Sequence, residues 1–234
     1  MKKRIICIIP ARGGSKGVPK KNIKLLNGKP LMQYTYEFAK QLGIFETICL
    51  STDSIEIFNI GNNLGMEVPF LRPEIISTDN SSSLDVIKHA VEYYKKVLNK
   101  EFDFVCLLQP TVPFRDADLF LNEIILFLKQ QEYDTLISFR KVPHKYNPEW
   151  VFKMNSESNA VLPLDENGIT KRRQDLLNYY YRDGSLYLFK IENLLSDSIY
   201  GNSILPIILT DNNDVNIDTI EDWIEAEEHT NRFL

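Results

Sequence analysis

Residues 5–17 read IICIIPARGGSKG, and this stretch decides the fold of the 234-residue chain. The apolar run over residues 5–9 predicts a fully buried strand, because a strand covered on both faces has no polar side. Pro10 ends the strand, and the glycines that follow predict a tight loop. A buried strand followed by a glycine-rich loop is typical of the first unit of a parallel α/β sheet.

Apolar runs alternate with helical patterns through the rest of the chain, which predicts repeated βα units. Further strands are expected at residues 48–51, 104–108, 135–139, 186–191 and 204–209. Helices are expected at residues 30–42, from 54 onward, and at 83–98, 116–130 and 219–229. The expected helix-end residues are Gly43 as a terminator, Asp53 as a cap, and the pairs Ser82–Asp85 and Asp218–Glu221 as capping boxes.

The regular pattern weakens between about residues 141 and 181, where several Pro, Asn and Ser residues occur. This predicts an insertion or a protruding arm. No internal repeat, low-complexity tract or linker divides the chain, so a single domain over residues 1–234 with a mostly parallel sheet is expected.

The composition is that of an ordinary globular protein and excludes a disordered, collagenous or disulfide-stapled chain. Cys7, Cys49 and Cys106 each lie inside an apolar run, which predicts buried reduced thiols and a cytoplasmic location. The first apolar run is shorter than the roughly 7–15 residues of a signal peptide core. No stretch approaches the roughly 18 apolar residues of a membrane span, so no membrane partner is expected.

Charge is distributed unevenly along the chain. The chain has 27 Lys and Arg against 32 Asp and Glu, a net charge of −5, yet no acidic residue precedes Glu37. From Asp211 to Glu228 there is no Lys or Arg, and such a segment either holds cations or is simply solvated. With a pI near 5.4, a local site for a compact polyanion is more consistent than a nucleic-acid-binding face.

The loop after the first strand has the residues that a phosphate site needs. Its glycines let backbone N–H groups turn toward an anion, and its cations supply charge-assisted hydrogen bonds to phosphate oxygens. The cations are Arg12, Lys16, Lys20 and Lys21. A triphosphate is the expected guest, although neither the dinucleotide fingerprint nor the Walker pattern is present. The alternative is a tight turn whose lysines are merely solvated.

Residues 8–22, IIPARGGSKGVPKKN, resemble the opening signature of the acylneuraminate cytidylyltransferases, which make CMP-sialic acids from CTP and a nonulosonic acid. Further matching segments follow in order: STD at 51–53, LRP at 71–73, the serines before Leu84, LLQPT at 107–111, and IDT at 217–219. The resemblance spans essentially the whole chain. It implies a three-layer α/β/α, Rossmann-like fold of the nucleotide-diphospho-sugar transferase type, with a dimerisation arm at about 141–181.

The resemblance implies nucleotide-binding roles for residues of the loop and of the segments that follow the second strand. Those expected to bind the nucleotide are Arg12, Gly13, Ser15, Lys16, Lys21, Asn22, Arg72 and Ser82. Of these, Asn22 is expected near the ribose, and Arg72 with residues 80–83 near the cytosine. The alternative for Arg72 is an ordinary surface arginine.

The resemblance also implies a site for the acidic nine-carbon sugar, formed by Gln109, Thr111, Arg173 and Arg182. Arginine suits the sugar carboxylate, because a guanidinium pairs with a carboxylate in a bidentate manner. The family's usual Arg-Pro-Asn-Gly order is replaced here by Arg182-Asp183-Gly184, so Arg182 lies one place closer to the glycine. Alternatively, Gln109 only caps its strand. A homodimer is expected. The tyrosines at 179–181 and Trp150 either pack its interface, which is favoured, or line the sugar pocket.

For the metal, Mg²⁺ or Mn²⁺, the resemblance implies Asp218 as the ligand, with Asn216 where the family commonly has another aspartate. An amide brings no charge, so either the metal is held more weakly or Asp211 or Asp214 compensates. The alternative for Asp218 is a simple helix cap. No His, by its spacing, suggests a metal cluster or a triad.

The expected reaction is attack of the sugar's anomeric hydroxyl on the α-phosphorus of CTP, with Arg12, Lys21 and Asp218 as catalytic residues and no covalent intermediate. A general base is not identified beyond the hypothesis that Asp218 acts through its metal. Two alternatives stay open: a related enzyme activating 3-deoxy-manno-octulosonate, and a non-catalytic nucleotide-binding module. The sequence does not choose among sialic, legionaminic, pseudaminic and deaminated acids.

Overall fold

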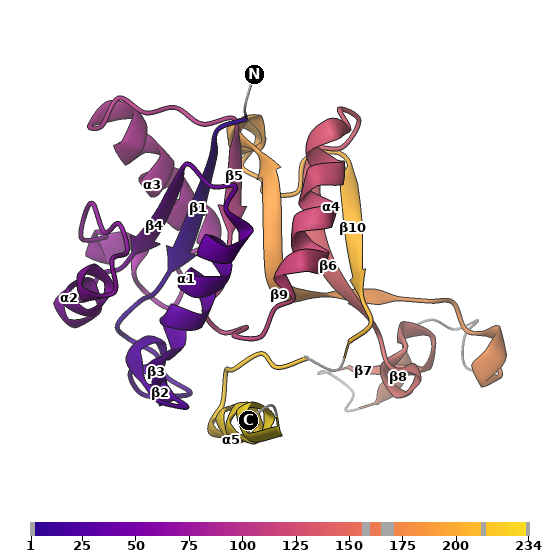
Figure 1. Cartoon of the computed structure of the whole chain (residues 1–234). Helices are drawn as coiled ribbons and strands as arrows, with labels where there is room; N and C mark the ends of the chain where they lie inside the picture. The colour runs from indigo at the N-terminus through magenta and orange to yellow at the C-terminus, as the bar shows by residue number, and fades with distance from the viewer. Residues whose placement is uncertain (1–2, 156–159, 165–170, 212–213, 233–234) are drawn as a thin grey trace.

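A six-stranded sheet forms the centre of the computed structural model, which describes residues 3–155, 160–164, 171–211 and 214–232 (Figure 1). The strand order is β10-β6-β9-β5-β1-β4. These strands are β1 (Ile5–Pro10), β4 (Thr47–Ser51), β5 (Phe104–Leu107), β6 (Thr135–Lys141), β9 (Tyr180–Lys190) and β10 (Ile204–Leu209). β1 runs parallel to β4 and β5, and β10 runs parallel to β6. The prediction of a mostly parallel sheet is therefore confirmed, with β9 antiparallel to both its neighbours.

Helices cover both faces of the sheet and give the predicted three layers. They are α1 (Leu31–Leu42), α2 (Ile55–Asn63), α3 (Ser83–Lys96), α4 (Ala117–Lys129) and α5 (Ile220–Arg232). The side chains of β1 alternate between the faces: Cys7 and Ile9 pack with α1 and α4, whereas Ile6 and Ile8 pack with α3. This alternation explains why the strand must be apolar at every position.

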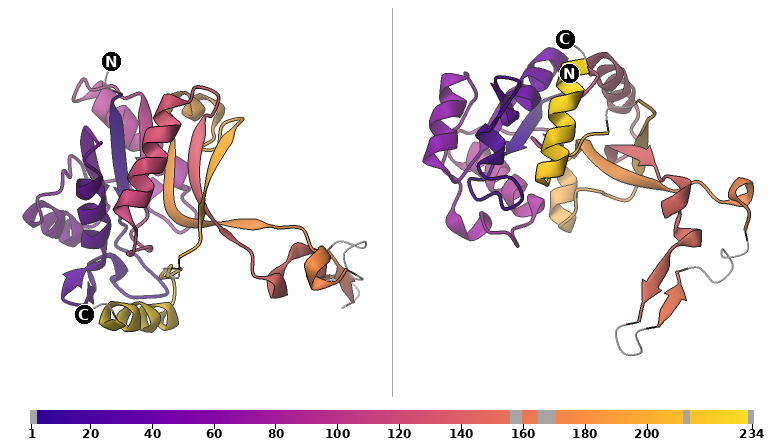
Figure 2. Two further views of the ribbon diagram at one scale, coloured as in Figure 1. Left: turned by 45° about the vertical axis from the view of Figure 1, so that its right-hand side comes forward. Right: turned by 90° about the horizontal axis from the view of Figure 1, so that it is seen from below.

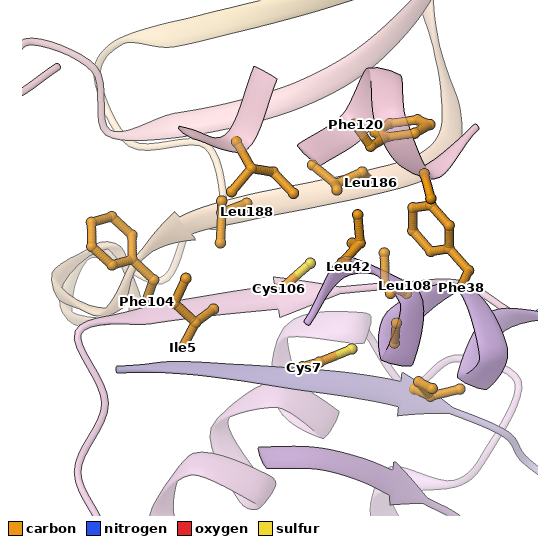
Figure 3. Close-up of a cluster of buried hydrophobic side chains, with 14 of the residues drawn as sticks. Ile5, Cys7, Phe38, Leu42, Phe104, Cys106, Leu108, Phe120, Leu186 and Leu188 are labelled. Atoms are coloured by element: carbon orange, nitrogen blue, oxygen red, sulfur yellow. The ribbon is translucent and has the colours of Figure 1, made fainter. Parts of the chain in front are cut away.

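Figure 3 shows the first of these two cores. Cys7 of β1 and Cys106 of β5 lie on neighbouring strands, and Leu188 of β9 lies beside Cys106 in the sheet. Leu42 of α1 belongs to the same cluster. Cys49 is also buried, and all three cysteines are free, as predicted. Phe38 of α1 meets Phe120 of α4 edge to face, with the ring centroids 5.5 Å apart, which fixes the two helices against each other.

A third, smaller core holds α5 on the main body. Trp223 and Ala226 of α5 pack with Val18, Leu26 and Leu31 in one cluster of buried residues. The short 3-10 helix η1 (Lys21–Ile23) lies between Val18 and Leu26 in the sequence. Two short strands, β2 (Leu25–Leu26) and β3 (Lys29–Pro30), form a hairpin in this region. The C-terminal helix α5 therefore lies beside the end of the glycine-rich loop, at the bottom of the molecule in Figure 1 and away from the N-terminus at the top.

The predicted arm projects away from the sheet between β6 and β9 (Figure 2). It contains the hairpin of β7 (Phe152–Met154) and β8 (Val161–Pro163) and the 3-10 helices η3 (His144–Tyr146), η4 (Pro148–Trp150) and η5 (Arg173–Asp175). Two further 3-10 helices, η2 (Glu74–Ile76) and η6 (Ile191–Ser196), belong to the main body. No helix in the described residues is long and apolar enough to cross a membrane.

Two predicted helix caps are wrong, each by one residue. Ser54, not Asp53, caps α2, because its hydroxyl accepts from the backbone N–H of Ile57. At α5 the capping pair is Thr219 and Asp222 rather than Asp218 and Glu221. Both displaced aspartates have contacts elsewhere, at the site described below. The predicted Ser82–Asp85 box at α3 and the Gly43 terminator of α1 are confirmed.

Candidate active site

A cavity of about 450 Å³ opens at the carboxyl ends of β1, β4 and β5, where ligands gather in open α/β sheets. Four segments far apart in the sequence line it, contributing Arg12, Ser15, Lys16, Lys21, Asn22, Arg72, Ser82, Gln109, Thr111, Asn216 and Asp218. Each of these residues is one that the sequence analysis singled out. Gly13 lies in the same loop without lining the cavity.

The glycine-rich loop is held from three sides. The side chain of Asn22 donates to the carbonyl of Arg12 over 2.9 Å. The backbone N–H of Gly13 donates to the carboxylate of Asp53 over 2.9 Å, which is the contact that takes Asp53 away from helix capping. A Cβ on Gly17 would lie 1.9 Å from the carbonyl oxygen of Asp218, so only glycine fits there.

Lys21 fastens the C-terminal segment to this loop. Its ammonium donates to a carboxylate oxygen of Asp218 over 2.9 Å and to the carbonyl of Ile217 over 2.6 Å. The Lys21 side chain is 12% exposed, whereas that of Asp218 is 67% exposed. Since Thr219 and Asp222 cap α5, Asp218 is not used as a cap, and it lines the cavity.

Asp79 is a site residue that the sequence analysis missed. One of its carboxylate oxygens lies 2.7 Å from a guanidinium nitrogen of Arg12, and the other contacts the ammonium of Lys16. Lys16 and Arg12 hold the pKa of the Asp79 carboxyl below its usual range. No sequence motif marks Asp79, because its partner Arg12 lies in another loop, 67 residues away in the sequence.

Arg72 is buried, so the alternative that it is an ordinary surface arginine is wrong. Its guanidinium donates to the hydroxyl of Ser77 over 3.0 Å and lies 3.6 Å from the carboxylate of Asp53. Burial lowers the pKa of the guanidinium, and Asp53 partly offsets this effect. Asp53 thus contacts both the glycine-rich loop, at Gly13, and the buried Arg72.

Gln109 and Thr111 follow β5 at the other side of the cavity. The guanidinium of Arg115 lies beneath them and donates to the carbonyl of Gln109 over 2.7 Å and to that of Ser185 over 2.9 Å. Burial lowers the pKa of Arg115 to about 10, which leaves it protonated at neutral pH. The backbone carbonyl of Thr111 accepts from the backbone N–H of Ile217 over 2.8 Å, so the end of β5 and the C-terminal segment are joined.

A second, smaller cavity of about 260 Å³ adjoins the first, and Gln109 lines both. Arg182 lines this cavity, where its guanidinium contacts the hydroxyl of Tyr200 and lies 5.7 Å from the centre of that ring. Gln109 is therefore placed between two cavities, which a simple strand cap would not require. Arg173 lies in η5 of the arm and lines neither cavity.

The order Arg182-Asp183-Gly184 has a structural reason. Asp183 is buried, accepts hydrogen bonds from the hydroxyls of Ser138 and Ser185, and lies 3.6 Å from the guanidinium of Arg140. It is thus a counter-charge for a buried arginine. Gly184 follows with φ +85°, and a Cβ there would lie 2.7 Å from the side-chain oxygen of Gln109.

The acidic segment before Asp218 does not add carboxylates to the cavity. Asp211 lies 2.7 Å and Asp214 3.2 Å from the guanidinium of Arg140. The hypothesis that either compensates for Asn216 is therefore not supported. Among the described residues no group of three or more His, Cys, Asp or Glu could hold a metal ion.

The fold and this cavity define a Rossmann-like nucleotidyltransferase. Among solved structures, a CMP:2-keto-3-deoxy-manno-octonic acid synthetase complexed with CTP matches 99% of this chain and all of its own, with a TM-score of 0.70 at 18% identity. That likeness shows the fold. A family model described as cytidylyltransferase matches residues 6–202, and the chain belongs to this family.

Curated relatives, two of them of similar length, narrow the family further. A pseudaminic acid cytidylyltransferase of Campylobacter jejuni is 35% identical over 93% of this chain and 92% of its own length. A CMP-N,N'-diacetyllegionaminic acid synthase of Legionella pneumophila is 33% identical over 96% of this chain and 95% of its own. An N-acylneuraminate cytidylyltransferase of Escherichia coli is 31% identical over 95% of this chain, but only 51% of its own length is covered.

Proposed function

We propose that the chain transfers the CMP unit of CTP to a nonulosonic acid and releases pyrophosphate. The observation that carries this proposal is the joining of Lys21 in the cationic loop to Asp218 within one cavity, next to a second cavity lined by Arg182. The related proteins act on pseudaminic, legionaminic and acylneuraminic acids by their names, which is consistent with this substrate class.

The triphosphate would lie over the glycine-rich loop. Arg12, Ser15, Lys16 and Lys21 line that part of the cavity and supply the charge that a leaving pyrophosphate needs. Arg72, Ser82 and Asn22 line the same cavity, and the cytosine would lie against Arg72 and Ser82 with the ribose near Asn22. The buried guanidinium of Arg72 is a fixed donor, because Ser77 and Asp53 hold it in place.

The acid sugar would occupy the smaller cavity. Its carboxylate would pair with Arg182, and Gln109 would contact the sugar where the two cavities meet. Thr111 lies at the same strand end. The wall includes apolar side chains, Leu84, Leu107 and Ile199, which suit the methyl groups of acetamido substituents better than a fully hydroxylated chain. Pseudaminic and legionaminic acids, each with more than one such group, are therefore the first substrates to test.

The reaction forms one bond and breaks another. The anomeric hydroxyl oxygen bonds to the α-phosphorus, the bond from that phosphorus to the bridging oxygen breaks, and pyrophosphate leaves with the electron pair. The hydroxyl proton passes to solvent. Lys21 and Arg12 neutralise the developing charge, and their fixed positions avoid reorganisation during the step.

A divalent cation, Mg²⁺ or Mn²⁺, fits this site as a partner of the substrate. Asp218 offers an exposed carboxylate on the cavity wall, and Asn216 lines the same wall with an amide oxygen. Mg²⁺ is bound in proteins by one or two carboxylates together with substrate phosphates and water, so a single aspartate is sufficient. When bound, the ion would supply charge neutralisation at the phosphates.

We also propose a homodimer formed through the arm, in the cytoplasm where CTP is made. Exposed apolar side chains gather on the arm: Phe152, Met154, Val161, Leu162 and Leu164 are between 42% and 71% exposed. An apolar patch of this kind favours burial against a second copy. Arg173, which lies on the arm away from its own cavity, would then be available to the partner's site. Nucleic acid and membranes are not expected partners.

The test is pyrophosphate release by the purified protein with CTP, Mg²⁺ and a panel of acid sugars, using UTP as the nucleotide control. Release that depends on CTP and on a nonulosonic acid supports the proposal. Pyrophosphate release with 3-deoxy-manno-octulosonate, and with none of the nonulosonic acids, would overturn the proposal that the substrate is a nonulosonic acid. Nucleotide binding with no release for any sugar would instead support a non-catalytic module.

A further inference from the structure

The carboxylate of Asp79 lies on the two cations at the tip of the glycine-rich loop. One oxygen pairs with Arg12 over 2.7 Å and the other contacts Lys16, and all three residues line the same cavity. Two oxygens on one centre, each facing a separate cation, reproduce the way in which a phosphate group would be held. Asp79 therefore stands where part of a polyanion would bind.

Asp79 is presented by a hydrogen-bonded turn between η2 and α3. In this turn the backbone N–H of Ser81 donates to the carbonyl of Thr78 over 3.2 Å, and the backbone N–H of Thr78 donates to the Ser81 hydroxyl over 3.0 Å. Ser82 follows at once as the cap of α3, so the turn is anchored to a helix. Such a turn keeps Asp79 near the cations even when its side chain swings away.

We propose that Asp79 sets the affinity of the site for nucleotide and pyrophosphate by competing with their phosphate groups for Arg12 and Lys16. This inference rests on the proposed function. A triphosphate must first displace the carboxylate, which lowers the apparent affinity by the fraction of molecules in which the cations are free. After reaction, the returning carboxylate repels the pyrophosphate and recovers both cations, so product leaves faster.

An ordinary surface ion pair would behave differently. Exposed pairs contribute little, and loss of one leaves ligand binding elsewhere unchanged. A residue that helps to bind the nucleotide or its metal would behave in the opposite way, since its removal would weaken binding. A carboxylate that competes with the ligand gives tighter binding when its charge is removed, and this direction separates it from both of these alternatives.

The variant is Asp79→Asn, with Asp118→Asn as the matched control. Asp118 is also exposed, lies in the first turn of α4, and changes the net charge by the same amount. Calorimetry with pyrophosphate alone, and separately with CTP, should give about three- to ten-fold tighter binding for Asp79→Asn and no change for Asp118→Asn. Raising the salt concentration should narrow the difference, because screening weakens both sets of ion pairs.

Turnover supplies a second readout. In Asp79→Asn the KM for CTP should fall and inhibition by pyrophosphate should strengthen. In Asp79→Glu, which keeps the carboxylate, both values should lie close to those of wild type. Unchanged or weaker binding of pyrophosphate by Asp79→Asn, with an unaltered melting temperature, overturns the inference. Binding is measured without any sugar. The calorimetry therefore tests the role of Asp79 even if the protein transfers CMP to none of the sugars.

Discussion

The ammonium of Lys21 and the carboxylate of Asp218, 197 residues apart in the sequence, lie 2.9 Å from each other. Lys21 also donates to the carbonyl of Ile217, so a single side chain joins the C-terminal segment to the glycine-rich loop. Two charges of opposite sign are thereby kept at one end of the cavity. A site for a phosphate–metal complex needs both, and the pair keeps each in place before substrate arrives.

Replacing Lys21 by Met should therefore have two effects at once: it removes a contact to the phosphates, and it removes the ion pair that holds Asp218. We expect kcat to fall by about 10²–10³-fold, the range found when one fixed donor to a developing charge is lost, and the Mg²⁺ requirement to rise. Lys20→Met is the control, because Lys20 pairs with Glu56 on the surface. Steady-state rates over a Mg²⁺ titration would measure both effects, and equal behaviour of the two variants would contradict this role.

Gly17 separates the loop from the backbone of Asp218. In Gly17→Ala the new Cβ would lie 1.9 Å from the Asp218 carbonyl oxygen, whereas Gly14→Ala meets nothing within 4 Å. The clash should cost about 1–3 kcal/mol of unfolding free energy and most of the activity, because the loop and Asp218 must move apart. Urea unfolding and turnover of both variants would test this. A Gly17→Ala protein as stable and active as Gly14→Ala would refute it.

Asp53 links the glycine-rich loop to the buried Arg72. Asp53→Asn keeps an oxygen for the Gly13 N–H but removes the negative charge near the Arg72 guanidinium, whose side chain is 3% exposed. We expect a loss of about 1–2 kcal/mol of stability and a higher KM for CTP. Asp103→Asn is the matched control, since Asp103 also accepts from a backbone N–H, that of Arg4, over 2.7 Å. A KM unchanged in both variants would show that Asp53 has no role in nucleotide binding.

His89 should make the fold sensitive to acid. Its pKa is lowered from 6.5, mainly by burial and then by the charge of Arg72, and its Nδ1 is buried with no hydrogen-bond partner in the described part of the chain. As pH falls below about 6.5 the unfolded chain takes up the proton first, so stability is lost until the folded pKa is passed.

His89→Gln removes this proton-linked loss. The drop in urea midpoint between pH 7 and pH 5 should be smaller in this variant than in wild type. His144→Gln on the exposed part of the arm serves as the control and should follow wild type. A His89→Gln protein with the full wild-type drop would show that other groups carry the acid sensitivity.

The strong periodic patterns predicted the layers, and most element bounds agree within two residues. The orientation of β9 was not predictable, because an apolar run has the same pattern in either direction. Its start at Tyr180 rather than near Leu186 was also missed. The first residues pair with β6 at the base of the arm, across an irregularity near Ser138, and only the partner strand makes them a strand.

The errors in the site have a common physical cause. At α2 and α5 two adjacent residues could each cap the helix, and local sequence does not separate them. Asp53 and Asp218 are taken by Gly13 and Lys21, contacts that exist only after folding. The ion pairs of Asp79 with Arg12 and of Arg140 with Asp211 are similar, since each joins segments that are distant in the sequence. The loop cations, Gln109 and Asp218 were predictable because their motifs are contiguous.

The most direct test of CMP transfer is phosphorus NMR of the purified protein incubated with CTP, Mg²⁺ and, in parallel, pseudaminic, legionaminic and sialic acids. We expect a phosphodiester signal of a CMP-sugar and an equal amount of pyrophosphate with at least one acid, both abolished in Lys21→Met. Unchanged CTP signals with every acid, under conditions where calorimetry detects CTP binding, would contradict it.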